Sequence, residues 1–173
     1  GFDRPNIFYR VQIKNNDKQQ LLAVLRERHS GHAGIVYVRT RKRADAVARW
    51  LEEKGIAALP YHAGLDNGVR RQNQHRFLME DGLMMVATVA FGMGIDKPDI
   101  RVVAHLDLPS SMEAYYQETG RAGRDGQPAE AWLFYSLADV VAMRNLQSLS
   151  EGNDVFKTVQ QRKLNAFLGF CES

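Results

Sequence analysis

The sequence lacks the features that define several protein classes. A single cysteine, Cys171, excludes an internal disulfide. No apolar run reaches the roughly 18 residues that a transmembrane helix needs, and the opening residues, G-F-D-R-P-N, do not have the pattern of a signal peptide. Internal repeats and low-complexity tracts are also absent. We therefore do not expect a disulfide scaffold, a membrane-spanning protein or a repeat protein.

Two motifs of nucleotide chemistry are missing as well. The chain has no phosphate loop of the form G-x-x-x-x-G-K-[ST] and no D-E-x-[DH] strand that would hold magnesium. It also offers no metal site of its own, because His62 has no second ligand at a suitable spacing and Cys171 alone cannot hold zinc. We therefore expect the chain by itself to be unable to hold Mg-ATP, and to be inactive as an ATPase.

The bulk composition is that of one ordinary globular domain. The chain has 173 residues, of which 45% are hydrophobic and 25% charged, and this length is sufficient to bury a substantial core. The net charge is +3 and the pI is about 9.1. A mildly basic balance permits a polyanionic partner without proving one.

Short apolar runs alternate with amphipathic stretches along the chain. Strand candidates are 34–38, 56–61, 83–88, 101–106 and 130–135, and helix candidates are 41–54, 69–80, 114–119 and a further helix after Ser136. Thr40 and Asp66 are expected N-caps, and Ser110 with Glu113 forms a candidate capping box. The alternation predicts an α/β fold, a parallel sheet covered on both faces, with functional residues beyond the carboxyl ends of its strands.

Residues 115–126 read Y-Y-Q-E-T-G-R-A-G-R-D-G and carry the most specific pattern in the chain. Arg121 and Arg124 are three residues apart, which on a helix places both side chains on one face, and Gln117 lies one turn upstream. Arginine makes bidentate contacts with phosphate oxygens, and the flanking glycines allow another surface to approach closely. The pattern indicates arginines that reach a nucleotide across an interface. An isolated R-x-x-R would favour a solvated basic turn instead.

Residues 86–98 read V-A-T-V-A-F-G-M-G-I-D-K-P, a strand that runs into a glycine-containing loop. Small residues such as Gly92 let the backbone approach phosphates, and its N–H groups can bind them. Asp96 can accept a hydrogen bond from a ribose hydroxyl or orient an arginine. The glycines alone would favour a tight turn with a capping aspartate.

Two further stretches follow strand candidates. In I-V-Y-V-R-T-R-K-R, Arg39, Thr40 and Arg41 come directly after a strand and can hold backbone phosphates, whereas Lys42 and Arg43 are expected to face water. In Y-H-A-G-L, residues 61–65, the N–H groups of Ala63 and Gly64 can meet a phosphate. A lone histidine such as His62 is more often a hydrogen-bonded structural residue than a metal ligand or a base.

These motifs resemble those of RecQ-type DNA helicases. Residues 117–124 have the form Q-x-x-G-R-x-x-R of the sixth motif of superfamily two, residues 86–98 resemble the fifth motif almost letter for letter, and residues 35–41 fit the fourth, I-x-Y-x-x-[ST]-R. DEAD-box RNA helicases are less similar, since they usually carry histidine in place of Gln117. The resemblance covers nearly the whole chain. It implies the second RecA-like lobe of a helicase motor, a three-layer αβα domain with a mainly parallel sheet.

The resemblance also implies roles for individual residues. ATP would bind between two lobes, with Arg121, Arg124 and Gln117 as catalytic residues and Gly92 and Asp96 on the nucleotide side. The residues expected on the DNA side are Arg39, Thr40, Arg41, His62, Ala63, Gly64 and Thr88. ATP and magnesium would be held mainly by a first lobe of the same protein, and the other partners would be single-stranded and duplex DNA, with no membrane.

Family context further divides the chain. Residues 1–11, which include the family's R-P-N, would connect the lobes, residues 12–150 would form the second lobe, and residues 151–173 would begin a helical region leading to a zinc-binding module, the only expected zinc site. The full protein would be an ATP-dependent 3′–5′ DNA helicase of repair, recombination and replication. It would be intracellular and located with chromosomal DNA, in a prokaryotic cytoplasm or nucleoid or in a eukaryotic nucleus.

Two alternatives remain open at this level. A non-catalytic nucleic-acid-binding or regulatory module could keep the fold without the motor, although the intact Gln117, Arg121 and Arg124 argue against it. An RNA helicase lobe is the other alternative, and Gln117 and the Y-H-A-G-L loop argue against it. Contacts to a nucleic-acid backbone alone distinguish poorly between the sugars of DNA and RNA.

Overall fold

The computed structural model describes residues 4–88 and 95–141 of the chain. Within these residues, six parallel strands form one sheet in the order β1-β6-β5-β2-β4-β3. The strands are β1 (Ile7–Ile13), β2 (Ala33–Val38), β3 (Ala58–Tyr61), β4 (Met84–Thr88), β5 (Ile100–His105) and β6 (Ala129–Tyr135). The helices are α1 (Asp17–Arg28), α2 (Arg41–Glu53), α3 (Asn67–Met79) and α4 (Met112–Thr119). No described helix combines the length and apolar composition needed to span a bilayer.

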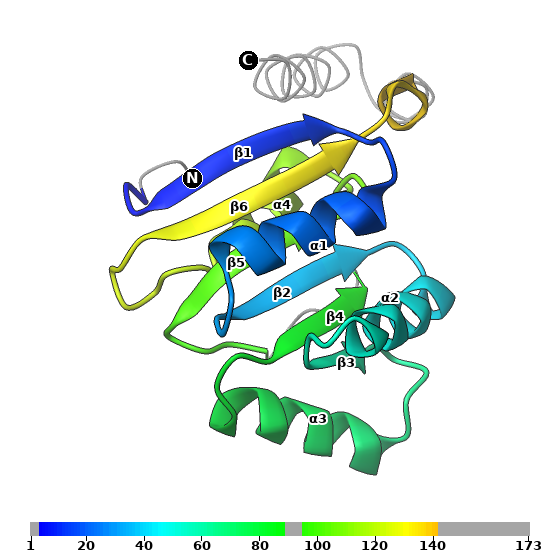
Figure 1. Ribbon diagram of the computed structural model, residues 1–173, viewed down its shortest axis with the longest axis vertical. Coiled ribbons are helices and arrows are strands. Elements are labelled where there is room, and N and C mark those ends of the chain that lie inside the picture. Colours follow the sequence, from blue (N-terminus) through cyan, green and yellow to red (C-terminus); the bar gives the residue numbers. More distant parts are fainter. Residues whose placement is uncertain (1–3, 89–94, 142–173) are drawn as a thin grey trace, which may run out of the picture.

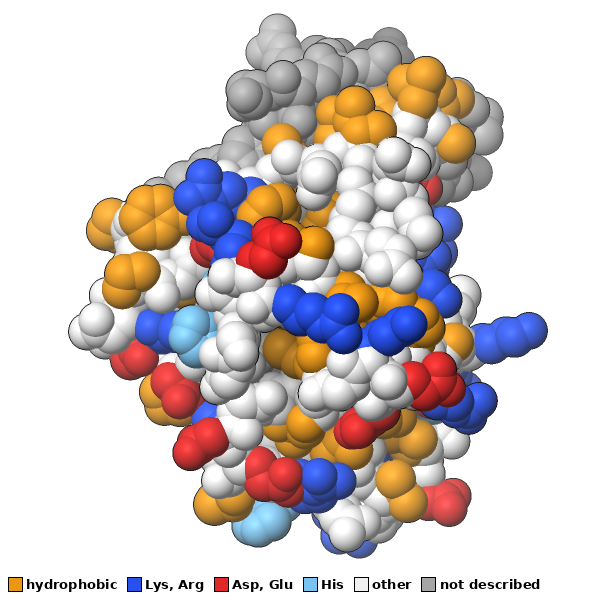
Figure 2. Space-filling model, viewed as in Figure 1, with side chains coloured by type: hydrophobic (Ala, Val, Ile, Leu, Met, Phe, Trp, Pro, Cys, Tyr) orange, Lys and Arg blue, Asp and Glu red, His pale blue; other side chains and the backbone are white. Residues whose placement is uncertain are grey.

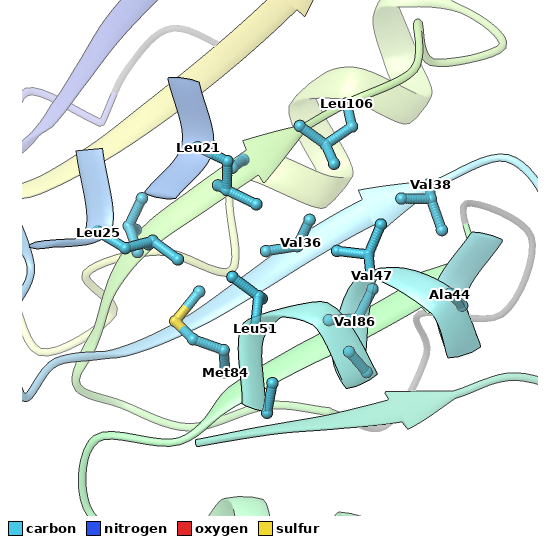
Figure 3. Close-up of a cluster of buried hydrophobic side chains, with 14 of the residues drawn as sticks. Leu21, Leu25, Val36, Val38, Ala44, Val47, Leu51, Met84, Val86 and Leu106 are labelled. Carbon is cyan, nitrogen blue, oxygen red and sulfur yellow. The ribbon is translucent and has the colours of Figure 1, made fainter. Parts of the chain in front are cut away.

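Helices cover both faces of the sheet, as Figure 1 shows with α1 and α2 in front and α4 behind. The front face packs against the buried residues of α1 and α2, among them Leu21, Leu25, Val47 and Leu51 (Figure 3). The opposite face buries Phe77 of α3 in one cluster and packs α4 in another. Each fully buried side chain of this size contributes about 1.5–3 kcal/mol of transfer free energy. The three-layer αβα prediction is confirmed.

The expected elements correspond to β2 to β6 and α2 to α4, with small shifts at their ends. Thr40 caps α2 as predicted, since its side chain accepts a hydrogen bond from the N–H of Arg43. The cap of α4 is Ser111 rather than Ser110, because the Ser111 hydroxyl accepts from the Ala114 N–H. After β6, Ser136 and Asp139 bond reciprocally to each other's backbone N–H groups, which is the capping pattern expected there.

Two elements were not predicted from the sequence. β1 is an edge strand, and residues 7–11 of the expected connecting segment belong to it. The connection to another lobe stays a prediction. α1 follows Asn16, which has left-handed backbone and makes no side-chain capping bond, so the usual start signal is missing. The expected helical region at 151–173 lies outside the described residues.

A buried carboxylate ties β1 and α1 to the sheet. Glu130 of β6 accepts hydrogen bonds from Arg10 Nε (3.1 Å), Arg28 Nε (2.9 Å), His29 Nε2 (2.7 Å) and Trp132 Nε1 (3.1 Å). Burial alone would raise the pKa of Glu130, but these hydrogen bonds outweigh it and hold that pKa well below its usual range. Burial also lowers the pKa of His29, although the Glu130 carboxylate opposes that shift.

The free energy of unfolding should therefore decrease in two stages as the pH is lowered. His29 has a folded-state pKa below 6.5, so its contribution decreases as the pH falls below that value. Glu130 has a folded-state pKa below 4.5, so its contribution is present above pH 4.5 and is lost as the pH falls toward the folded value. Urea unfolding at a series of pH values should show that Glu130→Gln lowers stability at pH 7 and flattens the dependence below pH 4.5. The exposed Glu53→Gln is the control, and identical curves for the two variants would contradict this assignment.

Candidate nucleotide site and nucleic-acid interface

The arginine motif lies in a turn that follows a helix. α4 ends at Thr119, and turns occupy the residues after it. Gly123 has a φ of 59°, a left-handed conformation that residues with a Cβ resist. The prediction that Arg121 and Arg124 share a helical face is therefore wrong in its geometry. The two side chains are nevertheless brought together, because both reach the same carboxylate.

That carboxylate belongs to Asp96. Arg121 Nη1 lies 2.6 Å and Arg124 Nη1 3.1 Å from Asp96 Oδ1. The side chains of Asp96 and Arg124 are 45% and 48% exposed, whereas that of Arg121 is only 14% exposed. An exposed ion pair contributes little to stability, so Arg124 can leave Asp96 for a phosphate at small cost. Gly92, the other residue expected on the nucleotide side, lies outside the described residues.

Gln117 is exposed on α4, upstream of the turn. Within the described part of the chain, no hydrogen bond joins its side chain to Arg121 or Arg124. The three expected catalytic residues therefore share one region of the surface, but only the two arginines are held together by a common partner.

A buried polar cluster beneath the turn was missed by the sequence interpretation. His105 Nε2 donates to Glu118 Oε1 over 2.8 Å, and both side chains are almost fully buried. The His105 ring stacks on Tyr37, with 5.0 Å between ring centroids. Burial raises the pKa of the Tyr37 hydroxyl, and the charge of Arg121 partly offsets this effect. Arg121 therefore emerges next to a fixed aromatic and carboxylate support, for which the sequence offered no local signal.

Lys97 fixes the segment that carries Asp96. Its buried ammonium group donates to the Phe77 carbonyl (3.1 Å) and the Glu80 carbonyl (2.7 Å) at the end of α3. A cation at a helix C-terminus satisfies carbonyls that have no partner within the helix, and complements the helix dipole. The sequence showed only a lysine beside a proline, with no indication of this contact.

The arginine turn lies at the amino end of the sheet. Gly123 N donates to the carbonyl of Ile100, the first residue of β5, over 2.8 Å, and Asp125 N donates to the carbonyl of Pro98. A hydrogen bond from Arg101 lowers the pKa of Asp125 and adds an ion pair to the same turn. The motif begins in the helix that follows β5, as expected, but its turn lies beside the amino end of that strand, because α4 runs back along the sheet before the turn begins.

The residues expected on the DNA side do lie at the carboxyl ends, on the adjacent strands β2, β4 and β3. Arg39 and Arg41 are exposed, and the Arg39 N–H donates to Asp107 Oδ2 over 2.7 Å. Arg43, expected to face water, instead pairs with Asp17 and lies 3.6 Å from Asp107. Figure 2 shows Lys and Arg side chains along the right-hand margin, toward which the strand arrows of Figure 1 point.

The loop at residues 61–65 is held by its histidine. His62 Nε2 lies 2.8 Å from Asp45 Oδ1, and His62 Nδ1 accepts from the Gly64 N–H over 3.0 Å. The Gly64 N–H therefore already has an acceptor within the loop. Ala63 is exposed, and the prediction that this loop contacts a phosphate therefore rests mainly on its N–H. A Cβ on Gly64 would lie 3.2 Å from Arg41 Cδ, so the loop and the Arg41 side chain are in close contact.

Thr88 ends β4, where it pairs with Val38 beside Arg39. Its side chain is buried, with a relative exposure of 6%. Thr40 is exposed, but its hydroxyl already accepts the helix-capping bond. The carboxyl end therefore presents two exposed arginines over a fixed loop, and the Thr40 hydroxyl can still donate its hydrogen while it accepts the capping bond.

Comparison with known proteins identifies the family and the fold. Residues 16–126 match the family described as helicase conserved C-terminal domain. The chain is 44% identical over its full length to the ATP-dependent DNA helicase RecQ of Haemophilus influenzae and 42% identical to the RecQ-like DNA helicase BLM of Xenopus laevis. It spans 28% and 13% of those two proteins. Domain 2 of the DEAD-box helicase Mss116p, solved bound to an RNA duplex, shares the fold with a TM-score of 0.67, at 19% identity over 92% of this chain and 69% of that one.

Proposed function

The chain belongs to the family of helicase conserved C-terminal domains, in its RecQ-type branch, and from this we propose that it closes the ATPase site of a DNA helicase motor. The proposed role is that of the second of two lobes. Arg121 and Arg124 extend toward a nucleotide held by a first lobe, and the carboxyl ends of β2, β4 and β3 contact the DNA backbone. The observation that carries the proposal is the convergence of both arginines on one exposed carboxylate.

On the nucleotide side, the geometry fits a mobile arginine finger, an arginine that reaches a phosphate bound by another lobe. The triphosphate and magnesium would be held by the other lobe, since this sequence has no phosphate loop. Arg124 rests on Asp96 and is about half exposed, so an incoming γ-phosphate can replace that carboxylate as its partner. Arg121 is held more deeply and would contact the phosphates from a fixed position. Preorganised positive charge of this kind stabilises the charge that develops during phosphoryl transfer.

On the DNA side, the exposed groups suit backbone contacts. Arg39 and Arg41 can bind phosphates, and the loop at residues 61–65 packs beside them. In the described residues, Arg39 and Arg41 are not part of a larger set of side chains that could read base edges. Their contacts to phosphates would position the nucleic acid without reading its sequence. The DNA-side residues lie at the carboxyl ends of the strands, whereas the arginines extend from a turn packed on the face that α3 covers, so one lobe can contact nucleotide and DNA at once. ATP-driven closure of two lobes would then move one lobe along the strand.

Single-stranded DNA should bind this chain weakly, with an affinity that falls as salt rises and without sequence preference. Removing two phosphate contacts should reduce the slope of log K against log salt by about 1.4, at roughly 0.7 for each contact on single strands. Fluorescence anisotropy at several salt concentrations should show this loss for Arg39→Ala/Arg41→Ala. The control Arg26→Ala/Arg49→Ala removes the same charge from elsewhere on the lobe. Equal loss in both double variants would show that net charge, and not this surface, binds DNA.

A further inference from the structure

We propose that Arg4 and Asn6 are positioning residues for the arginine turn. Together they form an N-terminal clasp, by which we mean the side-chain contacts of these two residues with the backbone of residues 120–127. The inference deepens the proposed function and rests on it, because the clasp would fix the backbone positions from which the Arg121 and Arg124 side chains extend.

The contacts of the clasp are direct and numerous. Arg4 Nη1 donates to the carbonyl of Gly120 (3.0 Å), and Arg4 Nη2 donates to those of Ala122 and Gly123 (both 2.9 Å). Asn6 Nδ2 donates to the carbonyls of Gly123 (2.7 Å) and Gln127 (2.9 Å). Two side chains therefore satisfy four backbone carbonyls of a segment that begins where α4 ends, and whose carbonyls have no helical partner.

Close packing makes the arrangement specific. A Cβ on Gly123 would lie 2.6 Å from Asn6 Nδ2 and 2.9 Å from the Gln127 carbonyl oxygen, so only glycine allows Asn6 to approach this far. The planar fork of arginine matches several carbonyls at fixed positions, which a lysine ammonium cannot reproduce. Asn6 is itself fixed, because its carbonyl accepts from the Ala129 N–H at the start of β6 over 2.9 Å.

The turn has other attachments, so losing the clasp should move it without unfolding the lobe. Gly123 N bonds to the Ile100 carbonyl, and Asp125 pairs with Arg101. These contacts hold the Gly123 N–H and the Asp125 side chain. Within the clasp, Arg4 holds the carbonyls on either side of Arg121, and Asn6 holds those of Gly123 and Gln127. Removal of the clasp therefore frees the backbone from which both arginines extend, while the sheet and its two faces stay packed.

The clasp also joins two functional segments that are far apart in the sequence. Residues 4–6 directly precede β1, in the stretch expected to lead from the first lobe, and they contact residues more than 110 positions later. A shift of that stretch is passed to the arginine turn through hydrogen bonds rather than through the body of the sheet. This gives the lobe connection a direct route to the arginines that complete the proposed ATPase site.

The test uses Arg4→Ala and the isosteric Asn6→Asp, which replaces a donor by oxygens facing two carbonyl oxygens. In the protein that joins this lobe to a phosphate-loop lobe, each variant should lower the turnover number for ATP roughly 10- to 100-fold, since a misplacement of about 1 Å costs about 10²-fold. The Michaelis constant for ATP should rise by no more than about tenfold, the change expected for complete loss of Arg121, because the other lobe holds most of the ground-state phosphate contacts. Arg4→Lys should recover only part of the loss.

Arg10→Ala is the matched control, because it removes an arginine on the adjoining strand that bonds to Glu130 and not to the turn. A positioning role also predicts non-additivity: Arg4→Ala should cause a smaller further loss when Arg121, whose flanking carbonyls Arg4 holds, is already alanine. If Arg4→Ala and Arg10→Ala reduce turnover equally, or if Arg4→Ala adds its full loss to Arg121→Ala, the clasp does not act through the arginines and the inference is wrong.

A structural measurement separates failure of the clasp from failure of the proposed function. In ¹H–¹⁵N spectra of the 173-residue chain, Arg4→Ala should shift the amide signals of Ala122 and Gly123 and leave those of β2 in place. Unchanged signals at Ala122 and Gly123 would overturn the inference whatever the ATPase assay shows. If those signals shift but Arg124→Ala has normal turnover, the clasp exists and the ATPase proposal is the part that fails.

Discussion

Arg124→Ala should reduce DNA-stimulated ATP hydrolysis by roughly 10³- to 10⁵-fold, the range typical of arginine fingers, in the protein that carries both lobes. Arg124 is about half exposed, and in the described residues its ion-pair partner is Asp96, so its removal costs the fold little. Its contribution arises when charge redistributes over the transferring phosphoryl group. ATP affinity should therefore change little, and steady-state turnover and equilibrium nucleotide binding should be measured on the same preparation.

Two variants sharpen this result. Arg124→Lys keeps the charge but not the planar fork, and it should restore only a small part of the activity. Arg71→Ala removes an exposed arginine of α3 and should leave turnover close to that of the unmodified protein. A loss of ATP affinity in proportion to the loss of turnover would make Arg124 a ground-state ligand, and the finger assignment would be wrong.

Much of the fold could be predicted because its central strands and helices carry strong local signals. β2 and β4 lie inside the parallel sheet, are buried along their whole length, and therefore appear as continuous apolar runs. α2 has both an apolar stripe and a capping threonine. β1 reads I-F-Y-R-V-Q-I, a pattern typical of a strand, but it stands within the segment that family context assigned to a connection between lobes. α1 has an apolar run of its own and begins without a side-chain capping bond. Tertiary contacts such as the Glu130 cluster then fix both elements to the sheet.

The residues of the candidate site divide in the same way, into those with a local sequence pattern and those without one. Arg121, Arg124 and Asp96 could be proposed because charged residues beside glycines form a distinctive pattern in the sequence. The residues that hold them could not, since Arg4, Lys97 and His105 act on partners far from them along the chain. Spacing indicated a shared helical face for the two arginines, but Gly123 ends any helical path there. The convergence on Asp96 is a product of the turn and not of helical periodicity.

Arg121→Ala should be nearly as severe as Arg124→Ala but should differ in kind. Arg121 is mostly buried, bonds to Asp96 over 2.6 Å, and lies against the Tyr37 and Glu118 support. We therefore expect its side chain to keep one position before and after the lobes close, and to contact the phosphates in the ground state as well as in the transition state. We expect a loss of roughly 10²- to 10⁴-fold in turnover, below or within the finger range, together with a weaker affinity for ATP.

Measuring turnover and ATP affinity separately distinguishes the roles of the two arginines. If Arg121 is a fixed ligand, Arg121→Ala weakens nucleotide binding by about tenfold, which corresponds to about 1.4 kcal/mol, while Arg124→Ala leaves binding nearly unchanged.

Asp96→Asn is the companion variant: it keeps the shape of the shared partner but weakens its hold on both arginines. Because Arg121 keeps its buried support and Arg124 does not, Asp96→Asn should reproduce part of the Arg124→Ala loss of turnover without the Arg121→Ala loss of affinity. If Asp96→Asn instead lowers ATP affinity as strongly as Arg121→Ala, Asp96 itself holds the nucleotide, and the division of roles between the two arginines does not stand.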